Sequence, residues 1–286
     1  MGIILAVLSC LLLGIANVLL KKSFKDFPPA ISFFIFTLIS AFTWLPTGLI
    51  LGVNLDTWLF GIGVGFLSAV LGQAFYIYVL EKGEISITAT ILSSFSIYTI
   101  LFSVLFNHEV LTSATSFFIL LTILGTIIVS FPEKFSRSEL KKMSLVLWPI
   151  AAAVAIGASD TITKNYITNS SVGSFLFFVS FAQLFVSIAY LKWAKQPLNQ
   201  LQIIFKSYKD YVFAAFGSLC ISISTLFLFL SFRFTLASIA SPIVASAPVI
   251  TVILAVFFLK EKIRPKDFIG LAFVLISIIA IGYLNP

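Results

Sequence analysis

The sequence predicts an all-α, polytopic membrane protein. Of its 286 residues, 60% are hydrophobic and only 10% are charged, with a mean hydropathy of +1.12. Soluble domains are about a quarter charged, so this much apolar surface requires lipid as its solvent. Ten apolar runs of about 20 residues, the length that crosses a bilayer, alternate with short charged clusters. Because backbone groups in lipid must be paired, and the alternating pattern of a membrane barrel is absent, we expect ten transmembrane helices.

The first five spans are separated by short polar or charged segments. Lys21 and Lys22 follow the first span instead of preceding it, and no small-residue cleavage site is evident, so we expect a membrane span and not a signal peptide. In the third span Gly61, Gly65 and Gly72 share one helical face, which favours close helix packing. The predicted bounds are Ile3–Leu20, Ile31–Leu51, Trp58–Leu80, Ile85–Phe106 and Ala114–Phe131.

The second five spans follow residues 132–144, a short, polar and basic segment that we expect to be a cytoplasmic linker. The longest loop, Ala194–Asp210, interleaves apolar and polar residues, which fits a helix lying on the membrane surface and a solvated loop equally well. In the ninth span, Pro242 and Pro248 free backbone carbonyls near mid-membrane and predict either a gating hinge or a static kink. The predicted bounds are Leu145–Ile167, Val172–Trp193, Tyr211–Phe232, Leu236–Leu259 and Asp267–Tyr283.

Basic residues are concentrated on one side of the membrane. When the gaps between spans are numbered alternately, one side has only Lys164 and Arg233. By the positive-inside rule the opposite side is cytoplasmic, so we expect both termini outside, in a plasma (inner) membrane. The basic residues of the cytoplasmic side are Lys21, Lys22, Lys25, Lys82, Lys134, Arg137, Lys141, Lys142, Lys192, Lys195, Lys206, Lys209, Lys260, Lys262, Arg264 and Lys266.

The chain repeats itself. At an offset of 152 residues Ser94 matches Ser246, Thr99 matches Thr251 and Glu109 matches Glu261, while an offset of 143 pairs Gly14 with Gly157 and Lys21 with Lys164. We therefore predict two five-helix units, residues 1–131 and 145–286. Because five is odd, the second unit enters the membrane from the opposite face, which gives the inverted symmetry common among secondary transporters.

The patterns VLFNHEVLTSATSFFILLTILGTIIV and VFFLKEKIRPKDFIGLAFVLISIIAIG, after the fourth and ninth spans of this duplication, resemble the EamA-type drug/metabolite transporter superfamily. The resemblance covers nearly the whole chain. It implies export or exchange of a small organic solute by alternating access, with a central cavity between the halves and the last span of each half outside it. Two features depart from the family: Ser96 stands opposite Pro248, which weakens the symmetry of any kink, and the charge bias opposes the family's usual cytoplasmic termini.

Other function classes find no support in the sequence. A single histidine excludes an HExxH zinc motif, and neither a GxxxxGK[ST] loop nor a GxSxG elbow is present, so we expect no enzyme, no metal and no cofactor. The net charge of +7 is explained by the topology signal, so no nucleic acid is expected as a partner. Cys10 and Cys220 lie inside spans and are read as small hydrophobic residues.

Sparse polar side chains at mid-span are the candidate solute ligands, since each is costly in lipid unless it lines a cavity or bonds another helix. In the third span Gln73, and not the glycines before it, is the better ligand candidate. The alternative for each hydroxyl is a bond to its own backbone or a helix contact. Besides Asp160, Lys164 and Asn17, the candidates are Gln73, Tyr76, Thr90, Ser94, Ser222, Thr225 and Ser246.

Asp160 is the sharpest single signal, because it lies inside the sixth span, and an acid within the membrane indicates function. Lys164 follows one turn later, so the alternative is an ion pair that only stabilises the helix end. The equivalent position in the first half is Asn17, so we expect no symmetric pair of proton-binding acids. His108, beside Glu109 at a span boundary, is read as a solvated interfacial residue in preference to a proton carrier.

The sequence bears on three functions. The first is a secondary transporter that exports or exchanges a small metabolite such as an amino acid, driven by a coupled proton or counter-solute, with spans 3, 4, 8 and 9 moving around a central site. The alternative is a flippase for an anionic or prenyl-linked lipid, which the basic cytoplasmic surface would attract. A membrane scaffold has no positive support in the sequence.

Overall fold

In the computed structural model, every element of the described chain is a helix. The structure describes residues 1–23, 29–75, 78, 91–130, 144–195, 208–259 and 265–285. The first half contains α1 (Gly2–Ser23), α2 (Pro29–Leu51), the short 3-10 helix η1 (Leu55–Thr57), α3 (Trp58–Leu67), the π-helical segment η2 (Ser68–Ala74), α6 (Phe95–Phe106) and α7 (Ser113–Ser130). The second half contains α9 (Ser144–Asn169), α10 (Val172–Trp193), α12 (Tyr208–Phe234), α13 (Ala237–Ala245), α14 (Ala247–Leu259) and α15 (Pro265–Leu284).

These helices confirm the polytopic all-α fold, and their described ends fall within a few residues of the predicted ones. Eight described segments are long and apolar enough to cross a membrane. The other two predicted spans are the shorter apolar helix α6 and α9, a 26-residue helix that contains Asp160 and Lys164. Residues 131–143 of the predicted linker and 196–207 of the longest loop lie outside the described residues.

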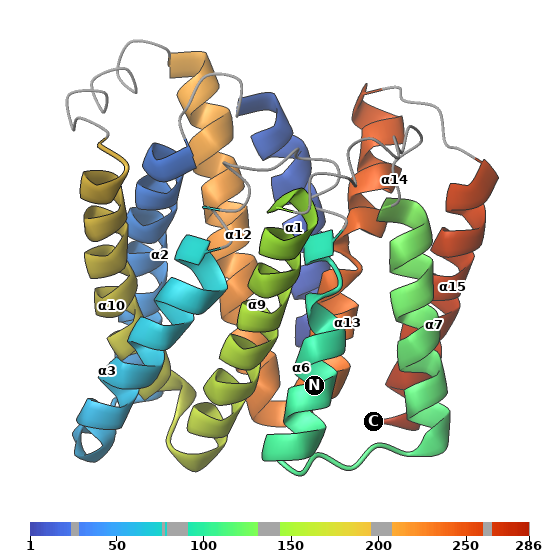
Figure 1. Ribbon diagram of the computed structural model, residues 1–286, viewed down its shortest axis with the longest axis horizontal. Helices are drawn as coiled ribbons and strands as arrows, with labels where there is room; N and C mark the ends of the chain where they lie inside the picture. The colour runs from blue at the N-terminus through green and yellow to red at the C-terminus, as the bar shows by residue number, and fades with distance from the viewer. Residues whose placement is uncertain are drawn as a thin grey trace.

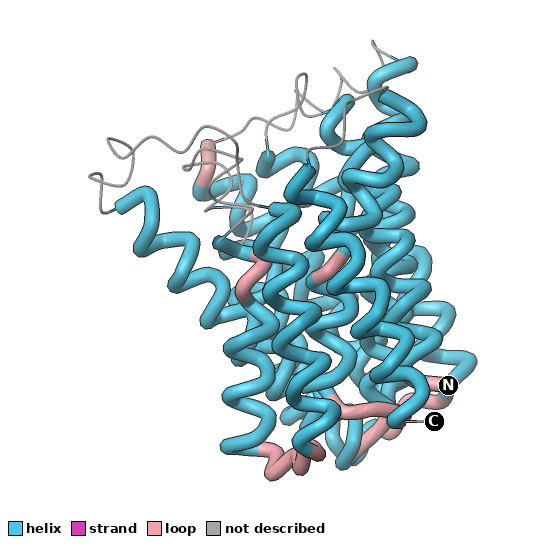
Figure 2. Tube along the Cα trace, turned by 90° about the vertical axis from the view of Figure 1, so that its right-hand side faces the viewer, coloured by secondary structure: helices cyan, strands magenta, loops and turns pink. Residues whose placement is uncertain are grey.

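Both chain termini lie at the same end of the bundle, which we call the termini end (Figures 1 and 2). A β-carbon at Gly2 would lie 2.7 Å from Cβ of Thr235, between α12 and α13. At the other terminus, the Asn285 amide donates to the hydroxyl of Thr115 on α7, at 3.3 Å. The two ends of a ten-span chain must lie on one side of the membrane, as the helix order here requires.

The fourth and ninth spans are each broken at mid-height, and the breaks are equivalent. Ser94 and Ser246 are turn residues, and each hydroxyl donates to the carbonyl three residues earlier, at 2.6 Å in both cases. These acceptors, Ile91 and Ile243, are again 152 residues apart. The break in the fourth span forms although Ser96 stands where the ninth span has Pro248, so a proline is not required for the two breaks to be equivalent. Figure 2 shows short loops at mid-height among the helices.

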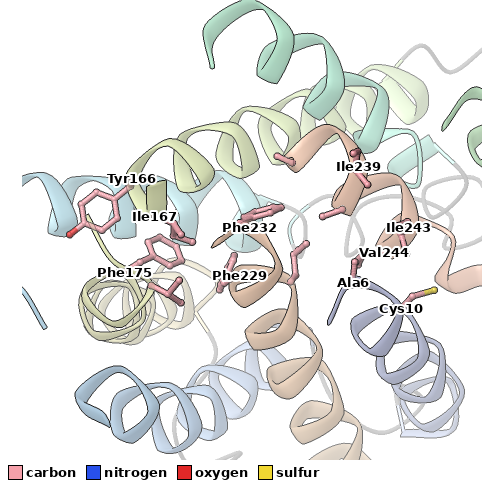
Figure 3. Packing of buried hydrophobic residues seen from close by; sticks show 14 of the residues in the cluster. Ala6, Cys10, Tyr166, Ile167, Phe175, Phe229, Phe232, Ile239, Ile243 and Val244 are labelled. Carbon is pink, nitrogen blue, oxygen red and sulfur yellow. The ribbon is translucent and has the colours of Figure 1, made fainter. Parts of the chain in front are cut away.

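The largest buried cluster joins the two halves (Figure 3). Ala6 and Cys10 on α1 pack with Ile243 and Val244 on α13, and further aromatic residues continue the cluster through α10 and α12. The rings of Phe175 and Phe229 are edge to face, with centroids 4.8 Å apart. Because lipid tails are as apolar as these side chains, close packing and buried hydrogen bonds, not removal from water, hold the helices together.

The last span of each half, α7 and α15, forms a pair at one side of the bundle (Figure 1). Gly125 and Gly270 face each other, and a β-carbon on either would lie 2.7 Å from the carbonyl oxygen of the other. Such close backbone approach is typical of small residues between membrane helices. The pair contacts the rest of the described bundle mainly through α13 and α14, which confirms that the fifth and tenth spans are peripheral.

Candidate functional site

Asp160 lies where three broken or crossing spans meet. Gly157 lets α9 approach α6 closely, since a β-carbon there would come within 2.7 Å of the backbone nitrogen of Thr99. One turn on, Oδ2 of Asp160 accepts a hydrogen bond from Ser241 on α13 at 2.9 Å and a longer one from Thr99 at 3.4 Å. The Asp160 side chain is 8% exposed, whereas Thr99 and Ser241 are fully buried. We call Asp160 and Thr99 the acidic station.

An equivalent arrangement is found where α1 crosses α14. A β-carbon at Gly14 would lie 2.5 Å from Cβ of Ile250, and the Asn17 amide donates to Thr251 Oγ1 at 3.3 Å. Asn17 and Thr251 are the repeat partners of Asp160 and Thr99, and we call them the amide station. Thr251 also donates to the carbonyl one turn earlier in its own helix, whereas the single hydroxyl proton of Thr99 is shared between Asp160 and the equivalent carbonyl, that of Phe95. The inverted repeat therefore carries one charged and one neutral version of the same contact.

Lys164 does not form the ion pair with Asp160 that was one reading of the sequence. Its ammonium donates to the backbone carbonyls of Phe232 and Thr235, the latter at 3.0 Å, at the C-terminal end of α12. A cation is favoured there because the last carbonyls of a helix have no partner within it. Lys164 is thus directed toward the termini end, away from the acid on its own helix.

Glu109 binds the start of α13, next to the end of α12 that Lys164 binds. We call this junction of α12 and α13 the corner. Its carboxylate accepts hydrogen bonds from the backbone N–H groups of Ala237 at 2.9 Å and Ser238 at 3.0 Å, and from the Ser238 hydroxyl. Leu236 precedes α13 and has no side chain that can cap it, so Glu109 supplies the missing cap from another helix pair. His108, with a φ of 54°, makes the left-handed turn that ends α6 and directs Glu109 inward.

The third span presents Gln73 from a π-helical segment, a geometry that is frequent at functional sites. A β-carbon at the preceding residue, Gly72, would lie 3.0 Å from the hydroxyl oxygen of Ser159, which precedes Asp160. Oε1 of Gln73 is buried and accepts no hydrogen bond. Gln73 and Asp160, two candidates from the sequence, are therefore each the next residue after Gly72 and Ser159, which lie close together.

Most of the predicted hydroxyls that the structure describes donate to backbone carbonyls of their own span, and one joins two helices. Ser222 bonds Thr43 on α2 at 2.6 Å, and its carbonyl accepts from the Trp44 indole at 3.0 Å. Thr225 donates to its own helix, at the carbonyl of Ile221. Ser94 and Ser246 stabilise the two helix breaks, and Tyr76 and Thr90 lie outside the described residues.

The two prolines of the ninth span stand on either side of its break. Pro242 is inside α13 and Pro248 is the second residue of α14, where a missing N–H costs little because the first helical donors have no partner in the helix. The turn at Ser246 lies between them, within a fully buried stretch. Both prolines are therefore placed where bending of α14 relative to α13 would occur.

Sequence reasoning missed a polar pair where α2 crosses α10. Ser40 and Gln183 are 143 residues apart, so they are repeat partners, and both are fully buried. The Ser40 hydroxyl and both polar atoms of the Gln183 amide have no hydrogen-bond partner. Three residues before Ser40, Thr37 donates to Ser187 at 2.9 Å across the same crossing. Extending the 143-residue offset into the second span would have found this pair.

Comparison with known proteins identifies the family of this chain and a solved structure with a similar fold. The EamA-like transporter family matches residues 1–131 and 143–283. The chain belongs to this family. Twenty-nine chains of solved structures match it, and one of them, described as "Crystal structure of protein", has a TM-score of 0.74 at 15% identity. That match covers 99% of this chain and 97% of the other, and it shows that the two chains share one fold. No curated protein matches the chain.

Membership of the family indicates a membrane transporter of small solutes. No group of three or more His, Cys, Asp or Glu side chains that would hold a metal occurs within the described ranges. Chemically, the site offers buried hydrogen-bond acceptors, one of them a carboxylate, set beside two helix breaks. Groups of this kind can form hydrogen bonds with a polar solute.

Proposed function

We propose that the protein is a secondary transporter that exports or exchanges a small organic metabolite, such as an amino acid, by alternating access. The observation that carries the proposal is the pair of equivalent helix breaks at Ser94 and Ser246. Each break is followed five residues later by a threonine that bonds a polar side chain from the opposite half. Broken helices at mid-membrane in inverted repeats are where secondary transporters bind their substrates. A central cavity between the halves, lined by spans 3, 4, 8 and 9, is part of this proposal.

The termini end is the gate that is shut in this conformation. There α6 packs against α13 and Glu109 caps α13, so the first and second halves are joined. Within the second half, Lys164 on α9 binds the end of α12. The described part of this end has Lys164 and Arg233 as its basic residues. By the positive-inside rule it faces outward, in a plasma (inner) membrane, and the cavity opens to the cytoplasm.

Counterflow in sealed liposomes tests the function. Purified protein is reconstituted with one unlabelled solute inside and a trace of the labelled solute outside, across a library of amino acids, amines, nucleosides, sugars and carboxylates, at two pH values. A carrier accumulates label only when the unlabelled partner is present, and empty liposomes give the baseline. If no member of the library exchanges while one lipid copurifies, solute transport is wrong and the lipid alternative replaces it.

A further inference from the structure

We propose that a junction between the α2–α3 turn and the α9–α10 turn stays closed throughout the transport cycle and is the fixed point about which the gate opens. The proposal rests on the proposed function, because alternating access requires the termini end, which is shut in this conformation, to open. Figure 1 shows both turns at this end of the bundle. The junction, which we call the clasp, consists of residues 48–57 of the first half and residues 166–174 of the second half.

Hydroxyl and backbone groups join the two turns of the clasp. The backbone N–H of Asn54 donates to Oγ of Ser174 at 2.8 Å. The hydroxyl oxygen of Thr57 lies 3.0 Å from the hydroxyl oxygens of both Tyr166 and Ser170, within hydrogen-bonding distance of each. Every one of these contacts connects the first half with the second. All of the groups are neutral near pH 7, so a change of pH around neutrality would not release them.

Glycine packing brings the two backbones of the clasp into direct contact. A β-carbon at Gly173 would lie 2.3 Å from the carbonyl oxygen of Gly52 and 2.8 Å from that of Gly48. Such close approach between membrane helices depends on small residues. At another level of the same crossing, Thr37 on α2 donates to Ser187 on α10 at 2.9 Å. A gate between α2 and α10 would therefore have to break two separate sets of contacts.

The corner is built from groups of a different kind. Glu109 binds the first N–H groups of α13, and Lys164 binds the last carbonyls of α12. Water can satisfy the unpaired groups at a helix end, and both side chains are charged, so hydration compensates for their separation. The corner can open to water at little cost, whereas opening the clasp would separate closely packed backbones.

Helix α9 takes part in both contacts. Its residue Tyr166 is bonded within the clasp, whereas Lys164, two residues earlier, reaches α12 from another face of the helix. One turn before Lys164, Asp160 accepts a hydrogen bond from Ser241 on α13. If the clasp stays closed, α9 remains against α3 while α12 and α13 move away from it. That movement exposes the acidic station from the termini end.

Cross-linking tests the proposal, because Thr57 and Ser170 meet through their γ-oxygens. Cysteines in their place bring two sulfur atoms within reach of a disulfide. Thr57→Cys/Ser170→Cys is made in a chain whose native cysteines are replaced by alanine, and counterflow of a solute that the wild type exchanges is measured in reduced and oxidised protein. We expect the oxidised protein to exchange within about twofold of the reduced one, since the bond joins parts that do not separate. Thr37→Cys/Ser187→Cys, at the second contact of the same crossing, should behave alike.

The matched cross-link spans the corner. In Glu109→Cys/Ser238→Cys a cysteine is shorter than the glutamate it replaces, so a short bifunctional thiol reagent joins the pair. We expect this bridge to lower exchange at least about tenfold, reversibly on reduction, because each turnover requires the gate to open.

The outcomes separate the clasp from the proposed function. An oxidised clasp that stops exchange, while its reduced form is active, would overturn the proposal and leave the transporter standing. Exchange that persists with the corner bridged would overturn it as well, since the corner would then not be the part that opens. A wild-type protein that exchanges nothing would instead remove the proposed function.

Discussion

At the scale of single residues, the corner between α12 and α13 depends on one carboxylate. Glu109 satisfies two backbone N–H groups of α13 that no side chain within its own segment can reach. Removing a partner from buried donors costs about 1–3 kcal/mol, so we expect Glu109→Ala to lower the free energy of unfolding by about that amount. Thermal unfolding in detergent measures it.

Glu109→Gln serves as the matched variant for this corner. Its amide oxygen can still accept from one of the two N–H groups, while the charge that favours a helix N-terminus is lost. We expect a loss smaller than that of alanine. Equal unfolding temperatures for wild type and Glu109→Ala would mean that water caps α13 equally well, and that Glu109 has no part in holding the gate.

The same corner shows what sequence could and could not reveal about single residues. Asp160 was identifiable because an acid inside an apolar run is costly wherever it points. The partner of Lys164 was not, since spacing along one helix predicts an ion pair with Asp160, whereas the long side chain reaches carbonyls on α12, 68 and 71 residues away in sequence. Contacts between distant segments depend on how the helices cross, so the sequence of one helix does not predict them.

At the scale of elements, the break in the ninth span is the proposed hinge. The fourth span breaks at the equivalent serine without a proline, so we expect the Pro242→Ala/Pro248→Ala variant to keep its broken helix and its solute affinity. Proline has no backbone N–H, so each proline removes a helical hydrogen bond that would resist bending. Alanine restores that bond, and we therefore expect the variant to exchange solute more slowly. Counterflow rate and solute binding, measured separately, test this. An unchanged rate would leave the prolines as static packing residues.

The crossing of α2 and α10 gives a second prediction at this scale. Gln183 buries an amide with no partner, and such a group costs about 1–3 kcal/mol. We expect Gln183→Leu to raise the free energy of unfolding by a comparable amount, as followed by thermal unfolding. On the same helix Ser187 is hydrogen-bonded to Thr37, so Ser187→Ala should stabilise nothing. A destabilised Gln183→Leu protein would show that the amide has a partner, such as bound water.

At the scale of the whole molecule, the helices and their inversion were predictable, because length and apolarity define a span and an odd number of spans inverts the repeat. The pairing of the two halves was not. Matching Asn17 with Asp160 in sequence identifies them as equivalent, but only the fold shows that each meets a threonine from the opposite half. These contacts between halves follow from the packing of α1 on α14 and of α9 on α6.

This equivalence permits a test that single substitutions cannot provide, in which the acid is moved from one half to the other. In the Asn17→Asp/Asp160→Asn protein the carboxylate would lie beside Thr251, with the neutral amide beside Thr99. If one solute lies between the stations, it can reach the acid on the other side, and we expect the solute exchange that Asp160→Asn impairs to return in part. Recovery should be incomplete, because Ser241 gives Asp160 a second donor that the structure does not show for Asn17. Counterflow of the double variant, compared with both single variants, measures the recovery. A double variant as inactive as Asp160→Asn, yet folded, would mean that the two stations do not face a common solute.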